Sequence, residues 1–336
     1  MNFWLELVLK LVLILGFVLT GALVVIYAEL KVGSHMQSRI GPYYAGGRWG
    51  WAQPLADGLK FLQKEDLAPA EADRTVYGLA PYVVMMSTVA VFVVIPFGPD
   101  LVGRDLDLGA YFILAISSLS VLGILMAGWS SANKYSLIGG LRAAAQLIAY
   151  ELPLVLAVAA VVVQAGTMSL TGIVAAQQET WFSIGGFDIS MPFIIKGQII
   201  GFVIFMVAAV AELSRIPFDM PIAESELTMG YLTEYSGIRF TMFFLGEYAS
   251  MIGLSAIAAT MYLGGYALPG VPENLENLLG PGIMIAKIAV LVFVIIWIRW
   301  TWPRLRADQL QSLAWQWLIP LALVNIALVA IFKVAF

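Results

Sequence analysis

Runs of about twenty apolar residues recur along the chain, and each is long enough to cross a bilayer core as a helix. The eight runs are Leu5–Ala28, Val76–Phe97, Gly109–Ser130, Ala143–Gln164, Pro192–Ala211, Thr241–Leu263, Gly282–Trp302 and Ala314–Phe336. The first is too long for a cleaved signal peptide, and Glu6 stands where such a peptide carries cations. We therefore predict an all-α polytopic membrane protein with eight transmembrane helices, in which residues 1–336 form a single membrane domain.

Two polar segments interrupt this pattern, at residues 29–75 and 212–240. In the first, Pro54 opens the stretch PLADGLKFLQKEDL, where Leu55, Leu59 and Leu62 recur at helical spacing. This spacing predicts an amphipathic helix lying along the membrane surface. An ordinary surface helix with solvated charges would show the same spacing.

The composition supports the membrane assignment and the positive charges give it a direction. Hydrophobic residues make up 61% of the chain and charged residues only 12%. Of the 18 lysines and arginines, thirteen lie in or beside the loops that follow the odd-numbered runs. Because cytoplasmic loops carry the excess of cations, both polar segments are predicted to be cytoplasmic and both termini to lie outside.

Several kinds of chemistry have no support in the sequence. The chain has no cysteine, so thiolate ligation of an iron–sulfur cluster is excluded. Its one histidine, His35, cannot build a metal site alone, and we interpret it as a solvated loop residue. We find no nucleotide-binding glycine motif, and the net charge of −4 gives no support for nucleic-acid binding.

The second polar segment is rich in acids. Its carboxylates, with the one that follows in the next run, are Glu212, Asp219, Glu224, Glu226, Glu234 and Glu247. Asp219 followed by Pro221 is typical of a helix start with Asp219 as the N-cap. Capping would not account for the remaining acids, which repel one another and should raise one another's pKa values. Groups of this kind exchange protons near neutral pH.

Carboxylates also occur within the apolar runs, where they are costly and usually functional. Glu151 lies nine residues past Arg142, about 13 Å inward, and Glu247 lies eight past Arg239, about 12 Å inward. With Glu212, these residues place three carboxylates in the cytoplasmic half of the membrane, which suits a proton path. For Glu212 an alternative is simple pairing with Arg215 at helical spacing.

Several phrases, taken together and in order, resemble one family over essentially the full chain. They are QSRIGP, PLADGLKFLQKED, AGWSSANKYSLIGGLRAAAQLIAYE, RIPFDMPIAESEL with TEYSG and GEY, and PRLRADQL. The resemblance is to the H-subunit family of bacterial NADH:quinone oxidoreductase, or complex I. It implies a multi-pass protein of the bacterial plasma membrane that forms the quinone cavity and couples quinone reduction to proton translocation.

The same resemblance implies partners and site residues. Quinone would be the substrate, and FMN and iron–sulfur clusters would be carried by partner subunits rather than by this chain. The partners implied are peripheral iron–sulfur and quinone-site subunits, small membrane subunits of the proton channel, and the lipid bilayer. The matching quinone-site residues are Glu29, Arg39, Asp57, Lys60, Lys64, Arg215, Phe218, Asp219, Glu224 and Glu226. The matching proton-path residues are Glu151, Glu212, Glu234 and Glu247.

Three positions depart from the family pattern. Ile222 replaces the first glutamate of the family's Pro-Glu-Ala-Glu-Ser-Glu-Leu, at the place where a capping-box glutamate would follow Asp219. Tyr43 replaces the asparagine of a Gly-Pro-Asn turn, and Leu30 stands where an arginine often follows the first-span glutamate. These departures weaken any transfer of a particular quinone preference.

Other functions remain open on the sequence alone. The equivalent anchor of a membrane-bound hydrogenase or of a coenzyme-F420-linked dehydrogenase shares parts of the acidic pattern. A self-sufficient secondary transporter would show an internal repeat with paired broken helices, and we find no clear similarity between the halves. A purely structural anchor would leave Glu151 and the acidic segment without a purpose.

Overall fold

The computed structural model describes residues 3–184, 187–268 and 273–335, and its side chains are described except for residues 3, 180–189, 273 and 274. The longer helices are α1 (Phe3–Met36), α3 (Arg74–Val91), α4 (Gly109–Ser130), α5 (Lys134–Ala165), α7 (Ile199–Glu212), α9 (Gly237–Tyr262), α10 (Glu273–Thr301) and α12 (Ile319–Ala335). The shorter ones are α2 (Gln53–Gln63), α6 (Leu170–Gln178), α8 (Glu224–Leu227) and α11 (Ala307–Ser312).

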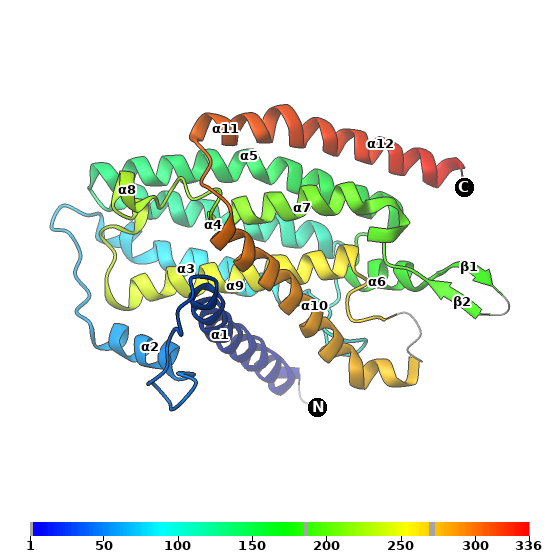
Figure 1. The fold of residues 1–336 in the computed structure, drawn as a ribbon, viewed down its shortest axis with the longest axis horizontal. Coiled ribbons are helices and arrows are strands. Elements are labelled where there is room, and N and C mark those ends of the chain that lie inside the picture. Colours follow the sequence, from blue (N-terminus) through cyan, green and yellow to red (C-terminus); the bar gives the residue numbers. More distant parts are fainter. Residues whose placement is uncertain (1–2, 185–186, 269–272, 336) are drawn as a thin grey trace.

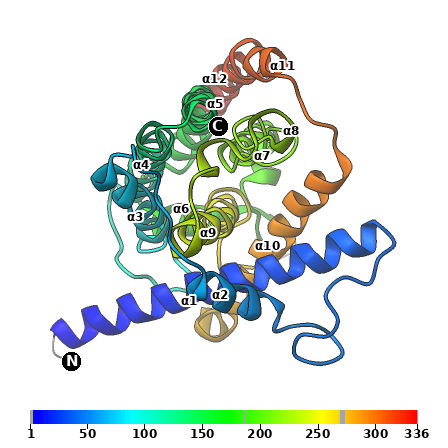
Figure 2. The ribbon, with the colours of Figure 1, turned by 90° about the vertical axis from the view of Figure 1, so that its left-hand side faces the viewer.

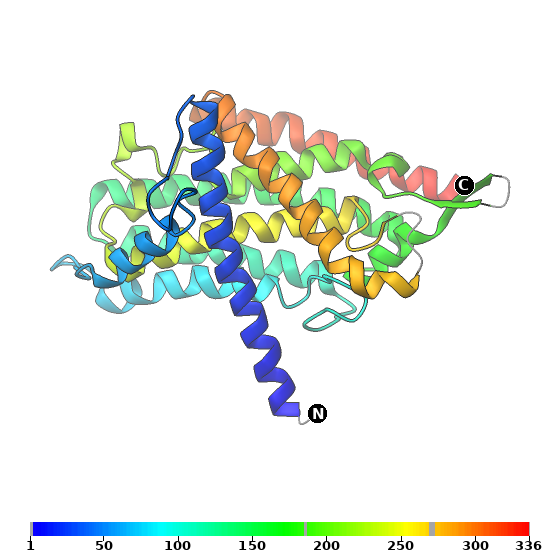
Figure 3. The ribbon, with the colours of Figure 1, turned by 60° about the horizontal axis from the view of Figure 1, so that its bottom comes forward.

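Most of the long helices lie side by side in one elongated bundle (Figure 1). Helix α9 is central, because its apolar side chains contribute much of the main buried cluster between α5, α7 and α10. Helices α1 and α10 cross the bundle obliquely instead of running along it, and the N-terminal half of α1 projects away from it (Figures 2 and 3). This crossing brings the C-terminal ends of α1 and α10 to the same end region of the bundle.

Within the described residues, seven helical segments are long and apolar enough to cross a membrane. They correspond to seven of the eight predicted spans, although Phe336 of the last one lies outside the described residues. The remaining prediction, Val76–Phe97, is longer than the helix found there, since α3 ends at Val91 and a turn follows. Helix α3 also begins with Arg74 and Thr75, which lowers its hydropathy, so the count of eight is not established by length and composition.

A two-stranded antiparallel hairpin was not predicted. It joins β1 (Thr180–Ile184) to β2 (Phe187–Ser190), in the connection between α6 and α7. The fold is therefore helical with one added hairpin, and all-α describes its membrane bundle only. Periodicity failed here because each strand has only four or five residues, too few to separate from an irregular loop.

The first polar segment begins later than predicted, because α1 continues past Ala28 to Met36. A helix, α2, is present where the amphipathic helix was predicted; it starts beside Pro54 and ends at Gln63, where Lys64 adopts an extended backbone. Its leucines Leu55, Leu59 and Leu62 remain about half or more exposed. The helix therefore exposes three apolar side chains, and its position along the membrane surface stays a prediction.

Candidate functional site

A buried arginine connects two helices that are far apart in the sequence. Arg215 follows α7 and is 3% exposed. Its Nη1 donates to Oε2 of Glu29 on α1 at 2.6 Å, and its Nε donates to Oε1 of Glu247 on α9 at 2.9 Å. A buried guanidinium is stable only when carboxylates compensate the loss of hydration. Arg215 therefore links α1, α9 and the turn after α7 by charge.

Two further side chains complete this group. Arg299, near the end of α10, donates from Nη1 to the other carboxylate oxygen of Glu29. The ring of Tyr248 lies 4.4 Å from the Arg215 guanidinium carbon, in a cation–π arrangement. We call Arg215, Glu29, Glu247, Arg299 and Tyr248 the arginine cluster. Its two cations and two carboxylates balance, so its members can be buried without net charge.

The arginine cluster retains an unused hydrogen-bond donor. Among the described residues, Nη2 of Arg215 is buried and has no hydrogen-bond partner. A buried donor without a partner is costly and is commonly served by water or a ligand. Nη2 of Arg215 is thus available as a donor to a water or to a polar group of a bound molecule.

The turn that carries Arg215 is fixed by a side chain that sequence reasoning missed. Gln146 of α5 is fully buried, and its Nε2 donates to the carbonyls of Ala211 at 2.7 Å and Phe218 at 2.8 Å. These two carbonyls stand on either side of Arg215 in the sequence. The Phe218 ring in turn packs edge-on against Tyr150 at 5.1 Å between centroids. Gln146 therefore holds both ends of the turn against α5.

Sequence reasoning also missed two members of the arginine cluster. Arg299 was counted only as a cation at the end of a span, and Tyr248 was not considered. The signal for Arg299 was its place at the end of an otherwise apolar run, opposite a buried carboxylate. For Gln146, a lone amide within an apolar run was the available signal.

Asp219 lies just beyond Arg215 and is half-buried in the acidic segment. Burial raises the pKa of its carboxyl to about 6, against the opposing effect of Arg304 and Arg299, while Glu247 and Glu224 raise it further. An acid with this pKa exchanges a proton close to neutral pH. The raised pKa of Asp219 comes mainly from burial and not from the expected repulsion, and a role in proton exchange stays a prediction.

Glu226 behaves in the opposite way and corrects the expectation of mutual repulsion. Its Oε2 accepts from Nη1 of Arg142 at 2.6 Å, and Arg304 lies 3.4 Å from its other oxygen. These cations lower the pKa of Glu226. Mutual repulsion thus contributes at Asp219 but not at Glu226, because Glu226 pairs with cations on α5 and after α10.

The predicted helix start at Asp219 is wrong. The short helix α8 begins at Glu224 with Ala223 as its N-cap residue. Ile222 is therefore not at a capping-box position, and it packs on a second apolar cluster that includes Tyr235 and Phe243. The departure from the family pattern at this position changes an apolar contact, not a helix cap.

Glu234 is placed at the start of α5 rather than beside the other acids. Nδ2 of Asn133, the N-cap residue of α5, donates to its Oε1. Its backbone carbonyl accepts from the Tyr77 hydroxyl at 2.7 Å. These contacts anchor the acidic segment to α5 and α3.

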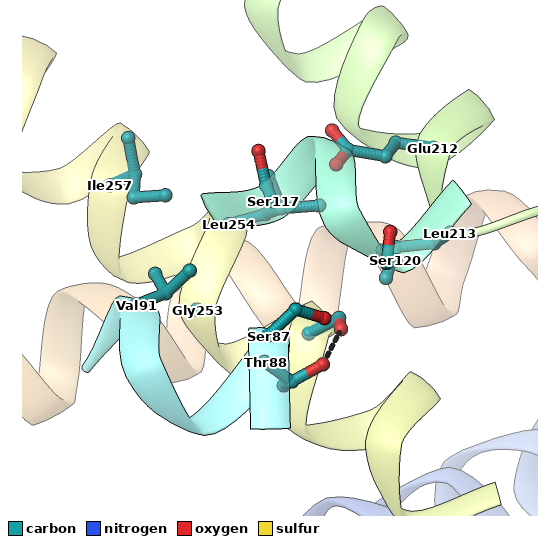
Figure 4. Close-up of a pocket in the computed structure, with 11 residues that line it drawn as sticks. Ser87, Thr88, Val91, Ser117, Ser120, Glu212, Leu213, Gly253, Leu254 and Ile257 are labelled. Atoms are coloured by element: carbon teal, nitrogen blue, oxygen red, sulfur yellow. Dashed lines mark hydrogen bonds between the residues drawn. The ribbon is translucent and has the colours of Figure 1, made fainter. Parts of the chain in front are cut away.

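Glu212 faces a small cavity inside the bundle (Figure 4). The cavity has a volume of about 50 Å³ and is lined by hydroxyl side chains from α3, α4 and α9. These are Ser87, Thr88, Ser117, Ser120 and Ser250. A cavity of this size with several polar partners can hold one or two waters. Within the described part of the chain Glu212 forms no ion pair, so the alternative of pairing with Arg215 is wrong.

Glu151 of α5 is partly buried. Pro153 follows it inside the same helix. Because proline removes an N–H from the helix ladder, it frees a carbonyl close to Glu151. Helices α5 and α7, which carry Glu151 and Glu212, pack against each other, and the relay between the two carboxylates stays a prediction.

The first-loop residues divide into two groups. Glu29 belongs to the arginine cluster. Asp57 instead pairs with Lys60 one turn away on α2 at 3.2 Å, and Arg39 donates to Gln37. Lys64 ends α2. No ion pair among the described residues connects these four to the arginine cluster, and no group of three metal-ligating side chains occurs there either.

Comparison with known proteins identifies the family. A sequence model of the family described as NADH dehydrogenase matches residues 9–330. The chain belongs to this family. It is 45% identical to the H subunit of the NADH-quinone oxidoreductase of Bacillus mycoides (strain KBAB4) over 330 residues, which cover 98% of this chain and 93% of that protein.

Other relatives give the same assignment. The chain is 43% identical to NADH-quinone oxidoreductase subunit 8 of Rhodothermus marinus, over 95% of this chain and 94% of that protein. It is 44% identical to the H subunit from Geobacillus kaustophilus (strain HTA426), over 98% and 93%. The resemblance to the H-subunit family noted in the sequence is confirmed.

Proposed function

We propose that this chain is the membrane subunit of a proton-translocating NADH:quinone oxidoreductase. It forms part of the quinone cavity and couples quinone reduction to proton movement. The observation that carries this proposal is the arginine cluster, a buried, charge-balanced group with one unused donor at Arg215. The names of the relatives support the reaction, and the contacts of the arginine cluster support the choice of residues that respond to it.

The chain contributes protons and charge, not electrons. Reduction of a quinone to a quinol consumes two electrons and two protons, and the electrons come from iron–sulfur and flavin groups of partner subunits. When negative charge develops on the quinone, it competes with Glu29 and Glu247 for the Arg215 guanidinium. Asp219, whose pKa is about 6, is the acid outside the membrane helices that is best placed to supply or take up a proton.

When Glu247 separates from Arg215, its carboxylate loses the cation that compensates it. This changes the charge that faces the membrane interior. Glu212 follows next along the path, with water in the hydroxyl-lined cavity as its proton carrier, and Glu151 continues it. Each step moves a proton between two carboxylates or between a carboxylate and a water, and it requires no change in the backbone. The partners of this path are the small membrane subunits of the complex.

The arrangement in the cell follows from the same proposal. Helix α3 also crosses the bacterial plasma membrane, which makes eight crossings in all. Both termini lie on the outer side. The arginine cluster and the acidic segment then face the cytoplasm, where the peripheral subunits dock. In this orientation thirteen of the chain's 18 lysines and arginines lie on the cytoplasmic side, as the excess of cations in cytoplasmic loops requires.

The relay is tested by Glu151→Gln in membrane vesicles that carry the assembled complex. We expect proton pumping to fall while NADH oxidation by an artificial acceptor continues. Glu71→Gln, on the exposed loop before α3, is the matched control and should pump normally. Unchanged quinone-linked pumping in Glu151→Gln would remove this residue from the path.

The quinone site is tested separately. Asp57→Asn and Glu224→Gln should slow quinone reduction without slowing electron transfer from NADH to an artificial acceptor. Equal loss of both activities would point to failed assembly.

Purification of the tagged chain in mild detergent is the broadest test of the proposed function. Flavin and iron–sulfur subunits should accompany the chain, whereas a self-sufficient transporter would be isolated alone and active.

A further inference from the structure

A second pocket lies away from the arginine cluster, between the end of α1 and the loop that follows it. Its volume is about 400 Å³, and its lining is Tyr27, Lys31, His35, Ile40, Tyr43, Arg48 and Trp49. The lining contains no carboxylate and combines cationic with aromatic side chains. We call it the loop pocket.

The loop pocket is preformed by contacts between α1 and the loop. The Tyr27 hydroxyl donates to the Trp49 carbonyl at 2.6 Å, and Nζ of Lys31 donates to the Pro42 carbonyl at 2.6 Å. Gly50 closes the loop, because its φ is +64° and an added Cβ would lie 2.4 Å from the Pro42 carbonyl oxygen. Binding of a ligand therefore does not include the conformational entropy cost of ordering the loop.

The charges in the loop pocket favour an anion. Arg48 is exposed and forms no ion pair among the described residues. Lys31 and His35 lie one helical turn apart, and Nδ1 of His35 donates to the Lys31 carbonyl at 2.7 Å, which leaves its Nε2 free to face a ligand. A free guanidinium is suited to bind two oxygens of a phosphate.

The surroundings favour a phosphate that carries acyl chains. Trp49 is 73% exposed and Tyr43 is 43% exposed, as aromatic side chains are at the level of lipid headgroups. Tyr27 and Lys31 share one face of α1 with Val24, which is 65% exposed. The half of α1 that leaves the bundle (Figure 3) also exposes apolar side chains, among them Val12 and Leu13, which are 60% and 58% exposed. The loop pocket thus joins a cationic headgroup site to a surface for hydrocarbon chains.

We infer that the loop pocket binds the headgroup of an anionic phospholipid from the cytoplasmic leaflet. Arg48 and Lys31 contact the phosphate, Trp49 and Tyr43 cover the glycerol region, and the acyl chains follow α1 past Val24. The bound lipid fixes the loop between α1 and α2 at the membrane surface. This role is independent of quinone chemistry, since it requires only the bilayer and the loop.

The inference is tested on the assembled complex with photoreactive lipids. The complex is reconstituted with phosphatidylglycerol or phosphatidylcholine that carries a photoreactive group near the headgroup, and labelled peptides are mapped by mass spectrometry. We expect phosphatidylglycerol to label residues 37–52. Arg48→Gln should lower this labelling about fivefold, the effect of one cation near an anionic surface.

Matched variants separate binding from folding. Arg74→Gln removes an equally exposed cation on the same side and should label as the wild type does. Arg48→Lys keeps the charge and should retain more labelling than Arg48→Gln. Electron transfer from NADH to an artificial acceptor shows that each variant has assembled.

Four outcomes would overturn the inference. Equal labelling by phosphatidylcholine would show that charge is not recognised, and unchanged labelling in Arg48→Gln would exclude this pocket. Displacement by inorganic phosphate at constant ionic strength would identify a site for free anions. Absence of labelling in the assembled complex would show that a partner subunit covers the loop.

Discussion

Arg215 and Glu29 form a buried ion pair at 2.6 Å, although 186 residues separate them in the sequence. The pair fixes α1, which crosses the bundle obliquely, to the turn after α7. Because Arg215 also contacts Glu247, a single guanidinium positions two carboxylates that the sequence had assigned to different roles, one to the quinone site and one to the proton path. The two predicted sites meet at this residue.

Removing Arg215 should be far more costly than removing an exposed partner. Arg215→Met leaves Glu29 and Glu247 without their shared cation, and we expect a loss of about 3–5 kcal/mol in the free energy of unfolding. Arg142→Met breaks the exposed pair with Glu226 and should cost about 0–1 kcal/mol. Denaturant titration of the purified chain in mixed micelles measures both. Similar losses in the two variants would contradict the buried cluster.

Glu29 and Arg299 should be energetically coupled. Glu29→Gln and Arg299→Gln each leave an uncompensated charge, whereas the double variant removes both charges together. We therefore expect the double variant to lose less stability than the sum of the single losses, by about 0.5–3 kcal/mol. A cycle of Glu29→Gln with Arg304→Gln is the control, because Arg304 contacts Glu226 instead. Strict additivity for Glu29 and Arg299 would show that they do not interact.

Asp219 should make stability depend on pH in a defined direction. Its pKa is raised from 3.8 to about 6 in the folded chain, so between these values the folded state binds more protons than the unfolded state. Stability therefore falls as pH rises through this window. Relative to Asp219→Asn, the wild type should lose about 1–2 kcal/mol between pH 4 and pH 6, after allowance for solvent screening. A difference that is constant over this range would exclude the shift.

Gly139 of α5 should tolerate no side chain, because it packs directly against the acidic segment at Gly230. An added Cβ at this residue would lie 2.6 Å from the Cα of Gly230, which is backbone and cannot move aside freely. We expect Gly139→Ala to destabilise the chain by about 1–3 kcal/mol. Gly78→Ala on α3 meets no atom within 4 Å and should be neutral or slightly stabilising. Equal behaviour of the two variants in thermal unfolding would contradict this packing.

Hydropathy predicted most of the membrane helices because each is governed by one simple requirement, an apolar length of about twenty residues. It placed the end of α1 too early because Glu29, Lys31 and His35 resemble loop residues when their partners are unknown. Glu29 is accommodated within the helix by Arg215 and Arg299, and that compensation depends on tertiary contacts.

The sequence predicted which residues belong to the site better than it predicted which of them form ion pairs. Glu29, Arg215 and Glu247 were selected, but sequence reasoning offered Glu212, three positions before Arg215, as the one alternative partner for this arginine. The turn at Leu213–Ser214 breaks that helical spacing and directs Arg215 toward α1 and α9. Gln146 was missed because its role is to bind two backbone carbonyls, which no sequence motif records.

The arginine cluster also sets an order for biosynthesis. Glu29 is synthesised 186 residues before Arg215 and 270 residues before Arg299. At ordinary rates of translation, roughly 15 to 50 s pass before its last cation emerges from the ribosome. Until Arg215 emerges the carboxylate has water as its only source of compensation, and until Arg299 emerges it has only one of its two cations, so we expect α1 to wait at a shallow depth in the membrane. It takes its final oblique position only when α10 arrives, which makes the first helix to be inserted one of the last to be fixed in place.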